Sequence, residues 1–519
     1  MPRLSTFLRT SLFAAALAAL GAGPPALAQK RGGDIVVGMG GGPDTLDPHF
    51  SRTQAARNVT IHVFETLIAR GENMEVIPLL AESYSASPDN TAFTFKLRSN
   101  VKFHNGKTMT ADDVVASLER YRLNGINKSS LADVAAIEKA DAGTVVIKTK
   151  KSSPIFLEVF SDYGTPYAIV PAEQAQQSMG RLDPVVGTGP YRFVEWVPDS
   201  HVKLARFDAY AAASGGGPNG FGGKKTAYLD TINFRIIKED GARVAALETG
   251  EVQVVEQLPT EAANRLAKSR KADIQIHDYP RYWIQNGFFN MVNPPFDKLE
   301  IRRAVQIALN MEEIMDVATD GAFELDASWQ YPGTPYHTDA GKEFYNAADA
   351  TRAKELLKQG GYKGEEIVLM TNSSYQDMYK AALVIEQQLK GIGMNVKLTV
   401  LDWPTSIQVR NKDRNAWHLF MGAMGSTIPL GPALAVSQLT GPGRTQFAMD
   451  PKWDALYERL LTEPTPEKRL EAWKEAQAYM YESALVLKLG NTTVKQAARA
   501  NVRGFKPYRA PRMWDVWLE

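Results

Sequence analysis

Apolar residues along the chain fall into short runs that are typical of strands. Residues 34–38 (DIVVG) form a mainly apolar run that leads into the glycine-rich turn 40–43. Residues 93–97 (FTFKL) alternate between apolar and polar side chains, which predicts a half-buried strand, and 101–103 (VKF) predicts a second short one. Thr110 precedes two aspartates, so a helix is expected to begin there, where a hydroxyl cap and negative charge are favoured.

The second half of the chain predicts a strand, a helix and a strand in close succession. Residues 367–370 (IVLM) have a buried-strand pattern, 378–389 carries apolar residues at helical spacing, and 396–400 (VKLTV) predicts the next strand. The short connections between these segments favour a βαβ unit, and therefore a parallel or mixed sheet. An amphipathic helix is expected at about 350–358, and a long surface helix at 466–480.

The glycine-rich segments do not predict a nucleotide site. Residues 214–223 (SGGGPNGFGG) have no strand before them and no GK[ST] after them, which favours a flexible surface loop over a phosphate-binding loop. Residues 38–43 follow a strand, but Pro43 stands where a dinucleotide-binding fingerprint needs its third glycine.

Length and composition limit the classes of protein. A chain of 519 residues is longer than one hydrophobic core usually organises, so two or three domains are expected. Hydrophobic residues make up 44% and charged residues 23%, as in folded globular proteins. The formal net charge is +1 and no basic stripe is present, which argues against a nucleic-acid partner.

The first 28 residues have the pattern of a secretory signal peptide. Arg3 and Arg9 precede a short apolar run, which leads into Ala26-Leu27-Ala28. The run is shorter than the roughly 20 residues of a transmembrane helix, and an A-x-A site follows it, so cleavage after Ala28 is expected. The chain contains no cysteine, so it has no lipid-attachment cysteine after the signal. These features predict a freely soluble protein of the periplasm.

Sequence motifs of catalysis are missing. The chain has no G-x-S-x-G, no H-E-x-x-H and no thiol, and its 7 histidines lack the spacing of a metal-binding pair. We therefore expect no catalytic residues, no cofactor and no metal site. An exported hydrolase stays open only as a remote alternative.

Phrases spread over the chain resemble the peptide/nickel-binding family of extracellular solute-binding proteins, often called family 5. No single phrase is specific, but their number and their order match the family. They are 33–38 (GDIVVG), 45–48 (TLDP), 63–67 (VFETL), 78–84 (PLLAESY), 93–98 (FTFKLR), 101–106 (VKFHNG), 110–114 (TADDV), 186–191 (VGTGPY), 241–247 (GARVAAL), 295–296 (PF) and 302–304 (RRA).

The resemblance implies an α/β, two-lobed periplasmic-binding-protein fold with mixed sheets, a hinge and an extra subdomain in the first lobe. Lobe I would contain 29–71, 185–285 and the C-terminal return 490–519; the inserted subdomain would be 72–184 and lobe II 286–489. The ligand would lie between the lobes, and the closed form would be recognised by membrane permease subunits of an ABC importer. A monomer is expected.

The ligand class follows less directly from the resemblance. Peptide binders of the family carry an aspartate in a lobe II loop that pairs with the peptide's amino terminus, but the matching stretch 418–432 contains no acid. An unpaired buried ammonium is costly, which weakens a standard peptide interpretation and favours a small polar or amphipathic organic solute. A short peptide is still the largest single class; oligosaccharides, opine-like conjugates and metal chelates stay open, as does a ligand sensor that docks on a chemoreceptor.

Ten residues are candidates for contact with the ligand, because loops at strand ends line the clefts of two-lobed α/β proteins. Each has a structural alternative: turn glycines, core aromatic residues or loop-capping hydroxyls. The candidates are Gly41, Gly42, Thr45, Tyr282, Trp283, Trp403, Met424, Gly425, Ser426 and Thr427.

Overall fold

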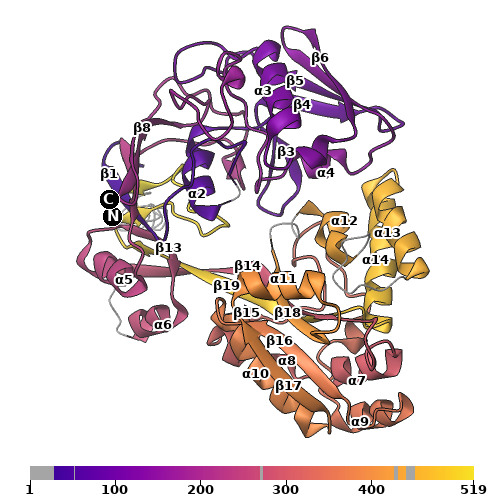
Figure 1. Cartoon of the computed structure of the whole chain (residues 1–519). Helices are drawn as coiled ribbons and strands as arrows, with labels where there is room; N and C mark the ends of the chain where they lie inside the picture. The colour runs from indigo at the N-terminus through magenta and orange to yellow at the C-terminus, as the bar shows by residue number, and fades with distance from the viewer. Residues whose placement is uncertain (1–28, 52, 269–272, 426–429, 440–449) are drawn as a thin grey trace, which may run out of the picture.

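The computed structural model describes residues 29–519 apart from 52, 269–272, 426–429 and 440–449. These residues form two lobes, with a smaller sheet beside the first lobe (Figure 1). Within them one mixed sheet of 11 strands passes through both lobes. Its strands are β1 (Asp34–Met39), β8 (Tyr191–Val197), β9 (His201–Arg206), β12 (Thr231–Ile236), β13 (Val254–Leu258), β14 (Ile274–Phe289), β15 (Phe323–Glu324), β16 (Glu366–Asn372), β17 (Asn395–Leu401), β18 (Leu419–Met424) and β19 (Val486–Arg499). Their order is β17-β16-β18-β14-β19-β13-β1-β12-β9-β8, and β15 also pairs with β19.

The first lobe is built around β1. Its helices are α2 (Gln54–Val63), α5 (Asp240–Thr249) and α6 (Thr260–Lys268). Strand β1 lies parallel between β12 and β13. Ile35 and Val37 pack in one core, and Val36 packs on the opposite face in the core that contains α5 and α6. Because both faces are covered, the residues of the strand after Asp34 are apolar, and the strand predicted at 34–38 is confirmed.

The second lobe contains the predicted βαβ unit. Its helices are α7 (Leu299–Ala308), α8 (Met311–Thr319), α9 (Ala350–Gln359), α10 (Gln376–Gly391), α11 (Trp403–Lys412), α12 (Pro432–Ala435), α13 (Pro451–Thr462) and α14 (Pro466–Glu482). Strand β16 pairs in parallel with β17, and α10 connects them, as predicted. Ile367 and Leu369 pack on one side of the sheet against α7 to α10, and Met370 packs on the other side in the core of α13 and α14.

Helix α14 corrects one prediction. A helix is present where one was expected, but only part of its surface faces solvent. Trp473 and Ala476 are fully buried, and Met480 is 1% exposed. The stripe of small and aromatic residues among its Lys and Glu side chains packs against the sheet, so this is an amphipathic helix rather than a surface one.

The smaller sheet has the order β4-β5-β7-β6. It consists of β4 (Ala81–Ala86), β5 (Ala92–Leu97), β6 (Val134–Asp141) and β7 (Thr144–Thr149), accompanied by α3 (Ala111–Asn124) and α4 (Phe156–Phe160). The strand predicted at 93–97 and the helix start at Thr110 are confirmed: the Asp113 carboxylate accepts a hydrogen bond of 2.9 Å from the Thr110 amide. The strand predicted at 101–103 is wrong, because only an isolated bridge from Lys102 to Thr108 forms there.

The glycine-rich segment 214–223 is not a free loop throughout. Residues 218–223 form a small hairpin of β10 (Pro218–Asn219) and β11 (Gly222–Gly223). Gly220 has a φ of +57°, and a Cβ there would lie 2.3 Å from the Arg70 carbonyl oxygen, so glycine is required by this close approach. The predicted flexible loop is therefore wrong for this half of the segment. Two further short pairs complete the strands: β2 (Ile68–Arg70) with β3 (Val76–Pro78), and β20 (Val502–Arg503) with β21 (Trp517–Leu518).

Two long strands connect the lobes. Residues 274–279 of β14 pair with 494–499 of β19 in the first lobe, and residues 283–288 pair with 486–492 in the second. The register shifts between Tyr279 and Trp283, where the strands pass from one lobe to the other. Among the described helices, none is both long enough and apolar enough to cross a membrane.

Candidate ligand-binding cleft

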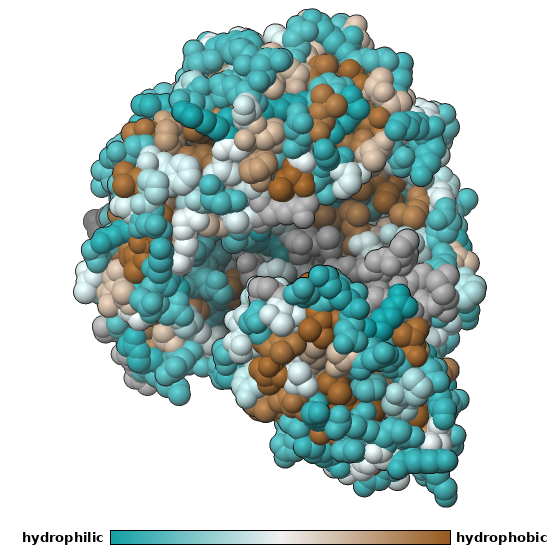
Figure 2. All heavy atoms as spheres, in the orientation of Figure 1, coloured by the Kyte–Doolittle hydropathy of each residue, from teal (hydrophilic) through white to brown (hydrophobic). Residues whose placement is uncertain are grey.

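The surface is deeply hollowed between the lobes, above the crossing strands β14 and β19 (Figures 1 and 2). Segments from distant parts of the chain are in contact with one another near these strands: the end of β1, the start of α2, β13, the middle of β14, the end of β18 and the loop near residue 509. Strand ends and helix starts meet here because the sheet passes from one lobe into the other at this point.

Polar side chains at the start of α2 form one hydrogen-bonded chain. The Gln54 Nε2 donates to Asn58 Oδ1 at 2.7 Å and to the Arg509 carbonyl oxygen at 2.8 Å. The Arg57 guanidinium donates to Gln54 Oε1 at 2.7 Å and to the Gly164 carbonyl oxygen at 3.2 Å. Residues three and four apart share one helix face, so the first turns of α2 present an amide and guanidinium surface.

Glu256 lies at one end of this chain, near the end of β13. Its carboxylate accepts a hydrogen bond of 3.0 Å from the Gly40 amide and a second one from the Asn58 side chain. The side chain is only partly exposed, and burial raises its pKa from 4.5 to about 7. The site therefore holds a carboxyl group that changes charge near neutral pH.

Arg509 lies at the other end and connects the lobes. It is 6% exposed, its guanidinium donates to the Gly425 carbonyl oxygen at 3.3 Å, and it lies 5.4 Å from the Tyr163 ring centre. Burial raises the pKa of Tyr163 to about 12, an effect that the positive charge of Arg509 opposes. A guanidinium stacked on a tyrosine suits recognition of a carboxylate or of carbonyl oxygens.

Trp283 and Gly425 face each other across the pair β14 and β18. Trp283 is 39% exposed, although tryptophan is highly buried on average. A Cβ on Gly425 would lie 2.3 Å from the Trp283 ring, so the absence of a side chain at this position makes room for the indole. The arrangement supplies a flat apolar surface beside polar groups.

The candidates in the loop after β1 differ in whether they border open space. Gly41 borders open space, because a Cβ there would meet no other heavy atom within 4 Å. A Cβ on Gly42, in contrast, would lie only 2.8 Å from the Ile236 Cδ1. Thr45 is 7% exposed and donates to the Gly180 carbonyl oxygen at 2.7 Å, so its hydroxyl is engaged within the lobe. It borders a different, outer pocket of about 620 Å³.

Met424 and Trp403 are mainly packing residues in this structure. Met424 is 2% exposed in the core of the second lobe. Trp403 is half-buried at the start of α11 and meets the Tyr375 ring edge-on at 5.3 Å. Tyr282 lies in β14, within the register shift. Ser426 and Thr427 lie outside the described residues.

The sequence analysis missed Glu256, Arg57 and Arg509. Each is a single charged residue without a motif around it, and the three belong to segments up to 452 positions apart. One local signal was available: Gln54 and Asn58 are polar residues four apart at the start of a helix, a spacing that places both on one face.

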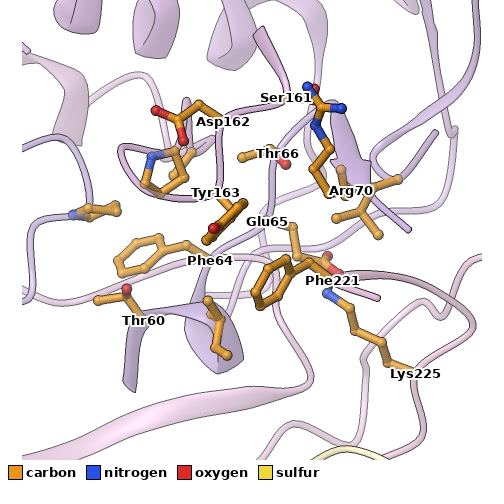
Figure 3. A pocket seen from close by; sticks show the side chains of 16 residues that line it. Thr60, Phe64, Glu65, Thr66, Arg70, Ser161, Asp162, Tyr163, Phe221 and Lys225 are labelled. Atoms are coloured by element: carbon orange, nitrogen blue, oxygen red, sulfur yellow. Dashed lines mark hydrogen bonds and ion pairs between the residues drawn. The ribbon is translucent and has the colours of Figure 1, made fainter. Parts of the chain in front are cut away.

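A second, smaller cavity lies between α2 and the loop that follows α4. It encloses about 50 Å³ beside Tyr163 and Phe221, and the Lys225 ammonium points to Glu65 there, at 3.1 Å (Figure 3). Both partners of this ion pair are nearly inaccessible, at 2% and 1% side-chain exposure.

Comparison with known proteins agrees with this architecture. The family model described as "Bacterial extracellular solute-binding proteins, family 5 Middle" matches residues 75–446. The glutathione-binding protein GsiB of Salmonella typhi is 28% identical over 510 residues, with 94% of this chain and 95% of that protein covered. Its counterpart in Escherichia coli is 27% identical over 487 residues, with 91% of each covered.

Among solved structures, the ABC transporter substrate-binding protein CtaP of Listeria monocytogenes superposes with a TM-score of 0.81 at 24% identity. The match covers 94% of this chain and all (100%) of the other. This likeness confirms the expected two-lobed α/β fold. The family inferred from the sequence motifs is confirmed as well: the chain belongs to the bacterial extracellular solute-binding proteins, family 5, and is a solute-binding protein.

Proposed function

We propose that the protein is a periplasmic receptor of an ABC importer, which captures a short peptide or peptide-like solute between its lobes and presents it to the permease. The family supports the solute-binding role, and the curated relatives named for glutathione, a tripeptide, support this ligand class. We also propose that the protein acts as a monomer, is exported through a cleaved signal peptide at 1–28, and does not transform its ligand.

The observation that carries the ligand class is the chemistry of the cleft. A half-exposed indole, Trp283, lies beside Gly425, whose carbonyl oxygen accepts a hydrogen bond from Arg509. Gln54 and Asn58 connect Arg509 to the carboxyl group of Glu256, and Arg57 donates to Gln54. A short peptide offers the complementary groups: an ammonium, a carboxylate, and amides between them. A neutral sugar would leave the charged groups without matching charges, at a cost in desolvation.

Closure of the lobes would complete the site. The register shift between Tyr279 and Trp283 interrupts the regular pairing where β14 and β19 pass between the lobes, so we propose the hinge there. The boundaries that we propose are 29–71, 185–285 and 490–519 for lobe I, 72–184 for its subdomain and 286–489 for lobe II.

Native mass spectrometry of the mature protein, purified from its own periplasm, tests the proposal. We expect a stoichiometric ligand that denaturation releases unchanged and that tandem spectrometry identifies as a short peptide or peptide conjugate. A sugar, an opine or a metal chelate in its place would contradict the proposed ligand class, and a cleaved ligand would favour the hydrolase alternative. Loss of uptake on deletion of the gene would separate transport from ligand sensing.

A further inference from the structure

We infer that Glu256, held by Asn58 and the Gly40 amide, is the group of the first lobe that binds the ammonium of the solute. The inference rests on the proposed function and makes it more specific. It assigns the recognition of the ligand's cationic end to the end of β13, in a chain whose segment 418–432 offers no acid.

The carboxylate has acceptor capacity to spare. Each of its oxygens accepts one hydrogen bond from a neutral donor, the Gly40 amide or the Asn58 side chain. A carboxylate has about four lone-pair sites, so roughly two stay available for an ammonium. Both donors fix the orientation of the group without neutralising it, which is the arrangement that a cation-binding carboxylate needs.

The nearest positive charge is already engaged. Arg243 of α5 acts on Glu256 only through its field, while its guanidinium donates to Asp240 at 2.5 Å and to the Ile237 carbonyl oxygen at 2.7 Å. Within the described residues, no lysine or arginine forms an ion pair with Glu256. The neighbours from β1 and α2, Gly40 and Asn58, are uncharged.

Room for the ligand lies directly beside the carboxylate. Gly40 is exposed, and the next residue, Gly41, borders open space on the side where a Cβ would point. Glu256 itself is partly exposed. A primary ammonium with three N–H donors could therefore approach the carboxylate from the cleft, and also donate to an exposed carbonyl group of the glycine turn.

Energetics favour a cationic partner. Burial raises the pKa of the Glu256 carboxyl to about 7, because the charged form has lost hydration and the field of Arg243 offsets that loss only in part. An ammonium supplies that charge and lowers the pKa again, so binding at neutral pH should release a proton from the protein. The Asn58–Gln54–Arg57 chain then orients a zwitterionic solute, with its carboxylate toward the guanidinium groups.

Isothermal titration calorimetry at pH 7.5 tests this assignment. The probes are glutathione, trialanine and the N-acetylated form of each; the proteins are the wild type, Glu256→Gln and the matched control Glu251→Gln. Glu251 lies five positions earlier, is exposed and pairs with Arg235 at 2.5 Å. We expect Glu256→Gln to weaken binding of the free-amine peptide by about 10-fold or more, with little effect on its acetylated form. The control should behave as the wild type.

A second readout uses the wild type alone, in case the variant folds poorly. Titrations at pH 6.5 in buffers of different ionisation enthalpy should show proton release with the free-amine peptide and none with its acetylated form. A wild type that binds both forms equally, or a Glu256→Gln variant that keeps the full preference, overturns the inference and leaves the proposed function standing. A wild type that binds none of the four probes overturns the proposed function, and the inference with it.

Discussion

Glu256 gives the ligand-free protein a dependence of stability on pH that can be derived from one side chain. Burial raises its pKa from 4.5 to about 7. Between these values the folded protein keeps the proton that the unfolded chain has lost, so the folded state binds more protons and its stability falls as the pH rises. The destabilisation is complete above about pH 7. Glu256→Gln removes it, and we expect the variant to melt about 2 °C or more above the wild type at pH 8 in scanning calorimetry.

The same variant should melt close to the wild type at pH 4.5, where both side chains are uncharged. Glu251→Gln, which changes an exposed carboxyl near the same strand, serves as the control and should shift the melting temperature little at either pH. Equal melting temperatures of wild type and Glu256→Gln at pH 8 would show that the carboxyl is well solvated.

A second prediction at the scale of one residue concerns the effect of Gly425 on solute binding. A Cβ there would lie 2.3 Å from the Trp283 ring, so Gly425→Ala must displace the indole or the end of β18. We expect this variant to bind its solute about 10-fold more weakly, since a misplaced aromatic wall loses contact area. In a Trp283→Ala background the clash is absent, and Gly425→Ala should then have little further effect. Equal losses in both backgrounds would contradict a role through Trp283.

At the scale of an element, the stability of helix α3 should depend strongly on Asp113 and only weakly on Asp112. Asp113 is fully buried and accepts hydrogen bonds from the amides of Thr110 and Ala172, each at 2.9 Å, and from Lys107 at 2.6 Å. Asp113→Ala leaves these donors without an acceptor, so we expect it to cost about 2–3 kcal/mol of unfolding free energy. The measurement is urea denaturation of both variants. Asp112→Ala removes only a surface pair with Lys139 and should cost less than about 1 kcal/mol.

Elements with a local cause could be predicted from the sequence. The βαβ unit of β16, α10 and β17 and the cap at Thr110 each depend on neighbours within a few positions. The strand predicted at 101–103 failed because its apolar residues are buried in a loop: Val101 is 2% exposed and Phe103 is fully buried. An alternation of apolar residues indicates that they are buried. Whether the segment forms a strand also depends on a partner strand, which cannot be identified from the local sequence.

The candidate site was less predictable for the same reason. Trp283, Gly425 and Gly41 were proposed from strand ends; in the structure Trp283 is 39% exposed beside Gly425, and Gly41 borders open space. Glu256 and Arg509 lie 253 positions apart in the sequence and belong to one hydrogen-bonded chain only because β13 and the C-terminal segment return to the same lobe. Such long-range pairing has no local signature, so an isolated charge gives no sign that it will line a site.

At the scale of the whole molecule, a buried polar cluster joins the inserted subdomain to the second lobe. Glu158 of α4 accepts hydrogen bonds from the Tyr336 hydroxyl at 2.6 Å and from the Arg469 guanidinium at 3.1 Å. Arg70 donates to the Glu158 carbonyl oxygen at 2.7 Å and to the Leu430 carbonyl oxygen at 3.1 Å. The side chains of Glu158 and Arg469 are 11% and 6% exposed. This cluster therefore fixes the spacing of the two bodies away from the hinge.

Breaking the cluster should change the shape of the ligand-free protein. Glu158→Gln leaves the Arg469 charge buried without its partner. Separating the two bodies would hydrate the guanidinium and so lower the free energy of the variant. We expect a larger radius of gyration in small-angle X-ray scattering and weaker solute binding, because part of the binding free energy is then spent on bringing the two bodies back together. Glu173→Gln, which alters an exposed pair with Lys107 in the same subdomain, is the control. An apolar pair, Glu158→Leu with Arg469→Met, removes the unmatched charge and should return the scattering profile toward the wild type. If the single variant scatters as the wild type does, the spacing of the lobes is set by the strands β14 and β19 alone.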